Sequence, residues 1–434
     1  MRLLGIGEDA DLAAMYHGLA RAGHQVRMYV GEAASHGIYR GLVHRVHDWH
    51  DELPWIRAAG AEGVIVFESA ARGCLQDTLR NEGYQVVGGS SFGDRLENDR
   101  VYGQMQLAAR GLNIAHSEAF TDFAAAIRFV RERRARYVYK SNGAGSARTR
   151  NYIGQASSGE DMISVLSAHR ARWAGPGAPD FVLMDFIPGV EVGVGAYFDG
   201  RQFLEPYCLD WEHKRLFTGD LGELTGEMGT VVTYRGAGRI FARTLATMQD
   251  ALALSGYCGY INLNLIANSD GLWPLEFTSR FGYPGYAICE ALHEETWDAI
   301  LMKMVRGTGE AIRTRAGYAL GVVLTVPPFP YVHGYEALSS GLPVLFDATM
   351  TDEERHLLTL AEVALEEDRL ITSGRIGYVG VATGVGDSIR LASDRAYTLA
   401  RKVLVPNLRY RTDIGDRVMN KDLASLTALG YLDP

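Results

Sequence analysis

A lysine at the end of a predicted strand precedes a glycine-rich segment whose composition suits phosphate binding. The strand covers residues 137–140, and residues 141–150 read S-N-G-A-G-S-A-R-T-R. Small residues let backbone amides approach phosphate oxygens, and Lys140 adds a fixed positive charge beside them. A glycine-rich hairpin turn would produce the same pattern, so a phosphate site here needs support from other segments.

An apolar run over residues 181–186 predicts a buried strand that leads into a Pro-Gly turn, with Glu191 just beyond it. The backbone of such a strand can bind adenine, and the carboxylate can bind ribose hydroxyls. A core strand followed by a surface glutamate is the alternative interpretation.

A second predicted hairpin joins residues 260–267 to residues 272–278 through a turn at residues 269–271. A three-residue loop would place Asn268 opposite Leu272, and the same register pairs Asn264 with Glu276.

Strand alternation then gathers oxygen-bearing side chains on one face of this hairpin, namely Asn262, Asn264, Glu276 and Thr278. Burying four such groups is costly unless a hard cation or phosphates use them. The pattern therefore predicts a magnesium–triphosphate site. A solvent-exposed polar face is the alternative, and it is less favoured because Arg280, Phe281 and Gly282 follow directly.

The composition is that of an ordinary globular protein. The chain has 434 residues, of which 47% are hydrophobic and 22% are charged. At about 150 residues per domain, this length predicts roughly three domains. A net charge of −9 argues against a protein dedicated to nucleic acids or acidic membranes.

Neither a membrane span nor an export signal is expected. No apolar run reaches the roughly 18 residues that a transmembrane helix requires, and the amino terminus begins a strand. The four cysteines are scattered and form no CxxC pair, which is typical of reduced thiols in a cytoplasmic protein.

The order of predicted elements indicates a multidomain protein of mixed α/β and α+β class. Residues 1–98 alternate strands and helices, which predicts a small parallel sheet with both faces covered. Residues 99–315 are richer in strands, one of them expected over residues 203–208, with helices near 101–110, 124–134, 161–168, 241–254 and 297–305. Residues 316–434 form a carboxy-terminal mixed α/β domain.

The first strand ends in Gly5-Ile6-Gly7, which has only part of a dinucleotide-binding fingerprint. Glu8, Asp9 and Asp11 follow, and we interpret them as acidic N-caps of the first helix. Carboxylates at this position would repel a phosphate group, so no nicotinamide site is expected.

At these residues the sequence resembles the ATP-grasp ligases and, more narrowly, the phosphoribosylamine–glycine ligases (glycinamide ribonucleotide synthetases). Residues 140–143 stand where that family has K-A-D-G, and residues 212–229 match D-H-K-R followed by D-x-G-x-N-T-G-G-M-G. Residues 276–282 match E-F-N-x-R-F-G, and residues 372–375 and 410–415 match two carboxy-terminal motifs.

The resemblance implies an ATP-grasp fold with an amino-terminal βαβ domain, a requirement for ATP and Mg²⁺, and amide formation through an acyl phosphate. It implies three catalytic residues: Lys140, Lys214 and Arg280. The implied ATP-binding residues are Arg100, Lys140, Gly143, Ser146, Arg148, Asp185, Phe186 and Glu191. The implied substrate-binding residues are His213, Lys214, Asp220, Thr225, Gly226, Arg280 and Gly282. The metal ligands expected from the resemblance and the hairpin register are Glu276, Asn264 and Thr278.

The departures from the family fall mostly on the substrate side. The family's amino-terminal N-G-G-R-E-H-A is here G-E-D-A-D-L-A, and its D-P-E after R-F-G is Tyr283-Pro284-Gly285. On the ATP side, Thr278 replaces an asparagine ligand and Arg148 replaces a loop lysine. Asn264, opposite Glu276, offers a replacement oxygen ligand.

The sequence therefore predicts an ATP-dependent carboxylate–amine ligase that uses an amino acid as carboxylate donor and a non-standard amine as acceptor. Two alternatives are a genuine phosphoribosylamine–glycine ligase of purine biosynthesis and a non-catalytic nucleotide-binding regulatory protein. The expected partners are small carboxylate and amine molecules, with no membrane and no nucleic acid, and homodimer formation is left open.

Overall fold

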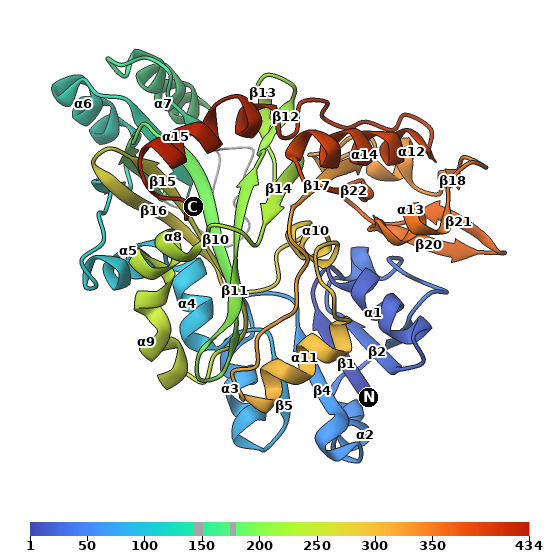
Figure 1. Cartoon of the computed structure of the whole chain (residues 1–434). Helices are drawn as coiled ribbons and strands as arrows, with labels where there is room; N and C mark the ends of the chain where they lie inside the picture. Colours follow the sequence, from blue (N-terminus) through green and yellow to red (C-terminus); the bar gives the residue numbers. More distant parts are fainter. Residues whose placement is uncertain (142–150, 174–178, 434) are drawn as a thin grey trace.

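The computed structural model describes residues 1–141, 151–173 and 179–433 (Figure 1). Its amino-terminal part is a five-stranded parallel sheet in the order β3-β2-β1-β4-β5. Leu3 and Val64 pack on one face, whereas Leu4 and Ile65 pack on the other, which confirms the expected parallel sheet with both faces covered. The strands are β1 (Arg2–Gly7), β2 (Gln25–Val30), β3 (His44–Val46), β4 (Gly63–Phe67) and β5 (Gln85–Val87), and the helices are α1 (Ala13–Arg21), α2 (Leu53–Arg57), α3 (Gly73–Asn81) and α4 (Ser91–Asn98).

A small antiparallel sheet follows in the order β6-β9-β7-β8, and the pair α6 and α7 packs beside it. Helix α5 (Arg100–Ala108) leads into this part of the chain. The elements are β6 (Ser117–Phe120), α6 (Phe123–Arg133), β7 (Tyr137–Ser141), β8 (Tyr152–Ile153), α7 (Glu160–Arg172) and β9 (Phe181–Asp185).

The largest element is an eight-stranded antiparallel sheet in the order β16-β15-β10-β11-β14-β17-β22-β19. Its strands are β10 (Val190–Asp199), β11 (Phe203–Glu212), β14 (Gly229–Thr233), β15 (Cys258–Asn268), β16 (Gly271–Thr278), β17 (Tyr318–Thr325), β19 (Leu358–Leu360) and β22 (Tyr378–Gly386). A hairpin of β12 (Arg215–Phe217) and β13 (Leu221–Leu224) projects between β11 and β14.

The carboxy-terminal residues extend this same sheet. Strands β17, β19 and β22 lie beyond residue 315, where the sequence places a domain boundary, yet they pair onward from β14. The proposed boundary therefore falls within the chain that builds one continuous sheet. The remaining strands are β18 (Leu345–Phe346), β20 (Val363–Glu366), β21 (Arg369–Thr372) and β23 (Val403–Leu404). The remaining helices are α8 (Gly238–Arg243), α9 (Gln249–Leu254), α10 (Gly285–Glu290), α11 (Trp297–Arg306), α12 (Tyr335–Ser339), α13 (Asp352–His356), α14 (Ile389–Arg401) and α15 (Leu423–Ala428).

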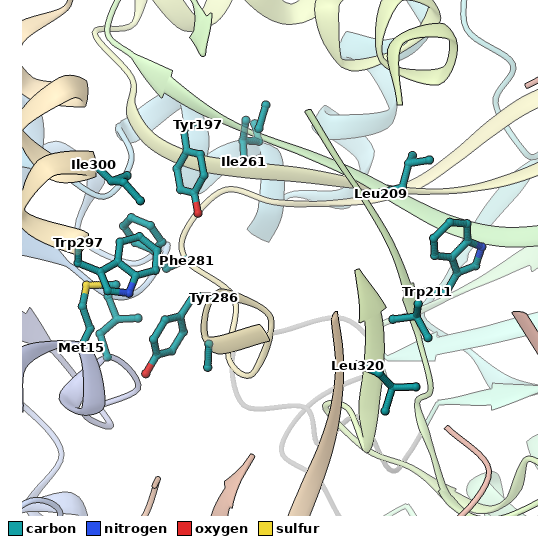
Figure 2. Close-up of a cluster of buried hydrophobic side chains, with 14 of the residues drawn as sticks. Met15, Tyr197, Leu209, Trp211, Ile261, Phe281, Tyr286, Trp297, Ile300 and Leu320 are labelled. Carbon is teal, nitrogen blue, oxygen red and sulfur yellow. The ribbon is translucent and has the colours of Figure 1, made fainter. Parts of the chain in front are cut away.

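One hydrophobic core joins the amino-terminal unit to the large sheet. Figure 2 shows Met15 of α1 next to Trp297 of α11 and Tyr286 of α10, and all three belong to one buried cluster. Tyr197 of β10 and Leu320 of β17 extend that cluster across the large sheet. Among the described residues, no helix is long and apolar enough to cross a membrane.

Two local expectations were wrong. The helix expected over residues 241–254 is interrupted at Thr244, whose hydroxyl donates to the carbonyl of Ile240 at 2.6 Å, and a 3₁₀ turn then separates α8 from α9. Helix α1 has Leu12 rather than an acidic residue at its N-cap position. Glu8 and Asp9 instead pair with arginines from distant segments, as described below for the site.

The β12–β13 hairpin is held by the carboxy-terminal segment. The guanidinium of Arg411 is 2% exposed and donates to Asp413 at 2.5 Å, to Asp220 at 2.8 Å and to the carbonyl of Arg215 at 3.0 Å. The contacts with Asp220 and Arg215 join segments almost 200 residues apart, so the carboxy-terminal segment supports this hairpin.

We expect Arg411→Gln to lower the midpoint of thermal unfolding by about 5 °C or more, because it leaves a buried ionic network without its cation. Arg369→Gln is the matched control, since Arg369 pairs with Glu367 at 2.9 Å while both side chains are more than 70% exposed. Differential scanning fluorimetry of the two variants measures both midpoints, and equal shifts would contradict a structural role for Arg411.

Candidate active site

A cavity of about 980 Å³ lies between the small sheet and the large sheet. The small sheet contributes Lys140, Val182 and Met184 to its wall, and the large sheet contributes Glu191 and Glu276. This volume is at the upper end for small-molecule sites, so it has room for a nucleotide and a second molecule.

Two cations from different elements converge on the carboxylate of Glu276. Lys140, at the end of β7, lies 3.6 Å from it, and Arg100, at the start of α5, lies 3.5 Å from it. Burial lowers the pKa of Lys140, whereas Glu276 opposes that shift. A polyanion would suit this part of the cavity because it would add negative charge next to buried cations.

Lys214 lies among three carboxylates from three strands. Its ammonium nitrogen is 2.9 Å from Glu191, 3.2 Å from Glu212 and 3.9 Å from Glu276. Burial alone would lower the pKa of Lys214, but the three carboxylates raise it well above its usual value. The same contact lowers the pKa of Glu191 against the opposing effect of its burial. Lys214 is therefore a permanently charged group in the cavity wall.

The β15–β16 hairpin has the expected residue pairs at the site, but its turn is shorter than expected and a bulge follows it. Asn268 pairs with Gly271 rather than Leu272, so that expectation was wrong. The side-chain oxygen of Asn268 accepts from the amides of Asp270 at 2.9 Å and Gly271 at 3.2 Å, which tightens the turn.

A β-bulge next to Pro274 then restores the register, so that Asn264 faces Glu276 and Asn262 faces Thr278. Proline has no amide hydrogen to donate, and bulges are among the few places where a strand tolerates it. The two site pairs expected from the sequence are confirmed, although the loop from which they were counted is shorter.

The donor set around Glu276 fits a magnesium ion bound together with phosphates. The amide nitrogen of Asn264 donates to Glu212 at 3.3 Å, so its carbonyl oxygen is not used by that contact. Within the described ranges, no group of three or more His, Cys, Asp or Glu side chains is arranged to hold a metal. Mg²⁺ characteristically takes one or two carboxylates together with substrate phosphates, and Glu276, Asn264 and Thr278 could supply the protein's share.

The predicted ATP-binding residue Phe186 lines the same cavity, and so do four predicted substrate-binding residues, namely Thr225, Gly226, Arg280 and Gly282. Arg280 is held by Glu97 at 3.1 Å, and this carboxylate raises the pKa of the guanidinium. The hydroxyl of Thr225 donates to the carbonyl of Lys214 at 2.9 Å, which ties the β13 end to the loop that carries Lys214.

Three predicted site residues do not line the cavity. Asp185 alternates with Met184 and Phe186 along the chain, so its carboxylate faces the other side and lies 3.9 Å from His116. His213 is 1% exposed and accepts from the amide of Gly415 at 3.2 Å; burial lowers its pKa to about 4.

Asp220 is the third, and it pairs with Arg411. His213 and Asp220 thus support the β12–β13 hairpin rather than contact a substrate. Gly143, Ser146 and Arg148 fall outside the described residues.

The sequence prediction missed two carboxylates in the cavity wall, Asp210 and Glu212. The expected strand ended at residue 208, whereas β11 continues to Glu212. Strand alternation puts both carboxylates on one face, so a longer strand prediction would have found them. The amide of Asn262 donates to Asp210 at 2.6 Å, and burial raises the pKa of Asp210 to about 7.

The acidic residues of the amino-terminal loop are not the N-caps of α1 that the sequence predicts. Glu8 pairs with Arg72 at 2.6 Å, and Asp9 pairs with Arg375 at 3.0 Å and accepts from Ser35 at 2.9 Å. The buried acid near the start of α1 is Glu68, whose pKa burial raises to about 8. Two of the three loop carboxylates are therefore neutralised by arginines from distant segments.

Comparison with known proteins shows similarity to one family of ligases. Residues 98–286 match the family model described as "Phosphoribosylglycinamide synthetase, ATP-grasp (A) domain". The phosphoribosylamine–glycine ligase of Chlorobaculum tepidum is 26% identical, with 96% of this chain and 100% of that protein aligned. The enzyme of the same name from Pseudomonas syringae pv. tomato is 27% identical over 80% of each chain.

Solved structures show the same fold. The phosphoribosylamine–glycine ligase of Thermotoga maritima superposes with a TM-score of 0.71 at 24% identity, over 95% of this chain and 100% of that one. The biotin carboxylase of Campylobacter jejuni superposes with a TM-score of 0.61 at 13% identity, over 98% of each chain. The chain therefore has the ATP-grasp fold and is similar to phosphoribosylamine–glycine ligases over nearly its whole length.

Proposed function

We propose that this ATP-grasp ligase joins an amino acid, through its carboxylate, to a small amine other than phosphoribosylamine. The observation that carries the proposal is the convergence of Lys140, Lys214 and Arg100 on Glu276 in the wall of one cavity. Bound MgATP would supply the phosphoryl group that turns the carboxylate into an acyl phosphate, which the amine attacks to give an amide, ADP and phosphate.

The protein's own contribution is positioning and charge. Lys140 and Arg100 would hold phosphate oxygens, and Glu276 would hold the metal with Asn264 and Thr278 beside it. Lys214 keeps its proton among three carboxylates, so it presents a fixed positive charge to groups in the cavity. Arg280, fixed by Glu97, offers a second cation for the carboxylate or its phosphorylated form.

The convergence of these groups in one cavity also favours catalysis over the alternative of a nucleotide-binding protein without activity. The other alternative, a genuine phosphoribosylamine–glycine ligase, is favoured by the two relatives of that name, which align with 80% or more of this chain. The replaced Tyr283-Pro284-Gly285 segment and the acidic amino-terminal loop favour a different substrate pair.

Lys140→Ala is expected to lower kcat for ADP formation by about 100-fold or more while the fold is retained, because it removes a buried cation beside the phosphates. Lys421→Ala, a change at an exposed lysine, is the matched control. Circular dichroism checks the fold, and a coupled assay measures ADP. Equal turnover in Lys140→Ala and the parent would contradict the ATP site.

The metal site gives a second prediction. Asn264→Ala should raise the Mg²⁺ concentration needed for half-maximal ATP turnover, because it removes an amide oxygen opposite Glu276. Thr278→Ala should raise it less, since a hydroxyl is the weaker neutral ligand, and Thr278→Asn should lower it. Magnesium titrations of the three variants decide the matter, and an unchanged requirement in Asn264→Ala would rule out this residue as a ligand.

The amino-terminal loop gives a third prediction. Because Arg72 and Arg375 are engaged by Glu8 and Asp9, the parent should show no saturable binding of ribose 5-phosphate, a stable probe for a sugar phosphate. The double variant Glu8→Gln/Asp9→Asn releases both arginines and should gain binding. Isothermal titration calorimetry measures both. Micromolar binding to the parent would support the phosphoribosylamine–glycine ligase alternative instead.

A further inference from the structure

The inner end of the cavity has a polar floor formed by side chains from three strands of the large sheet. Asp210 of β11, Thr230 of β14 and Asn262 of β15 line it, and none of the three is more than 6% exposed. In the described part of the chain, Oδ1 of Asp210, Oδ1 of Asn262 and the hydroxyl of Thr230 have no hydrogen-bond partner. Leaving such groups buried and unpaired is costly, so they indicate a ligand that pairs with them.

Glycines of β10 bring Asp210 and Asn262 together. These two residues lie on either side of β10, and the amide of Asn262 still reaches Oδ2 of Asp210 at 2.6 Å. A Cβ atom at Gly193 would clash with the Asp210 carboxylate, and one at Gly195 would lie 3.0 Å from the amide nitrogen of Asn262. The bare backbone of β10 is therefore what lets the two side chains meet above it.

Asp210 has no cation at ion-pair distance among the described residues, in contrast to four other carboxylates of the cavity. Glu191, Glu212 and Glu276 all contact Lys214, and Glu97 contacts Arg280. Within the described ranges, the side-chain hydrogen-bond partner of Asp210 is the neutral amide of Asn262. A buried carboxylate with a neutral partner and one unpaired oxygen is complementary to a positively charged donor.

The roof over this floor leaves open space. This roof consists of the cavity-lining residues Gly282, Tyr283, Gly285, Tyr286 and Cys289, and α10 packs against β14. A Cβ atom at Gly285 would meet no other atom within 4 Å, although the residue lines the cavity. Tyr286 lines the same cavity, and its ring lies 6.2 Å from that of Trp297 (Figure 2).

We infer that the inner end of the cavity binds the ammonium group of the carboxylate substrate, with Asp210 as its counter-ion, and that Gly285 leaves room for a side chain larger than that of glycine. This inference rests on the proposed ligase activity and adds to it the substrate class, an α-amino acid with a side chain. Asn262 is a positioning residue, because it orients the Asp210 carboxylate through its amide.

The test compares amino acids with their desamino analogues in pairs of equal length: glycine with acetate, L-alanine with propionate, and L-leucine with 4-methylpentanoate. The full-length protein, MgATP and hydroxylamine are incubated with each acid. Hydroxylamine attacks the carbonyl carbon of an acyl phosphate and releases phosphate, so the hydroxamate reports carboxylate activation without the natural amine. An amino acid larger than glycine should have a kcat/KM at least about tenfold above that of its desamino partner.

Asp210→Asn keeps the shape of the side chain and removes its charge. It should lower kcat/KM for the amino acid by at least about tenfold and leave that of the desamino acid within about twofold. Asp394→Asn, at an exposed position of α14, is the matched control. Gly285→Leu adds a side chain into open space, so it should fold normally, retain glycine and lose the larger amino acids.

Binding of a fluorescent ATP analogue, measured by titration in every variant, distinguishes failure of the ammonium subsite from failure of the ligase assignment. Equal kcat/KM for amino and desamino acids, or an unchanged ratio in Asp210→Asn, would overturn the ammonium subsite and leave the ligase assignment intact. No hydroxamate from any carboxylate, with ATP analogue binding retained, would overturn the ligase assignment and this inference with it.

Discussion

The ammonium group of Lys214 lies within 3.9 Å of carboxylates from three strands, namely Glu191 of β10, Glu212 of β11 and Glu276 of β16. Removing charges from water costs several kcal/mol per ion, so this cluster is stable only because each charge neutralises another. Glu276 also approaches Lys140 of β7 and Arg100 of α5. The same ion pairs therefore connect the large sheet to the small sheet and to α5.

The glycines of β10 let charged and polar side chains of the neighbouring strands approach one another. Gly193 and Gly195 leave the middle of the floor without side chains, so groups from β11 and β15 meet across it. A larger residue at Gly193 would force Asp210 away from Asn262. The floor thus contains a neutralised part around Lys214 and an inner part around Asp210, where the carboxylate has an amide and no cation as partner among the described residues. This difference in charge pairing is the physical basis for assigning phosphates to the first part and an ammonium group to the second.

The fold allows the two ends of the cavity to vary independently. Strands β7, β9, β15 and β16 supply the proposed ATP end, and these elements lie within the segment that matches the ATP-grasp family model. The roof of the inner end comes from residues 282–289, which connect β16 to the helices beyond it and can change without altering a strand. Tyr283 and Gly285 stand there in place of two family carboxylates, while Lys140, Glu276 and Arg280 are retained.

The sequence by itself determined the features that depend on local periodicity. It predicted the parallel amino-terminal sheet, the strand that ends at Lys140, and the pairing of Asn264 with Glu276, because alternation and turn chemistry act over a few residues. It did not determine the partners of charged side chains far apart in the chain. Glu8 with Arg72, Asp9 with Arg375, and Asp220 with Arg411 were all expected in other roles or not at all.

Only the tertiary structure decided these partners, because an ion pair depends on which elements the topology brings together, and a single sequence carries no local signal for that. The same reason applies to Lys214, because its position in the sequence does not indicate which three strands lie around it. The β15–β16 bulge is a related case. A turn one residue shorter than expected would have put Glu276 and Thr278 on the opposite face from Asn262 and Asn264, and the bulge beside Pro274 corrected the register.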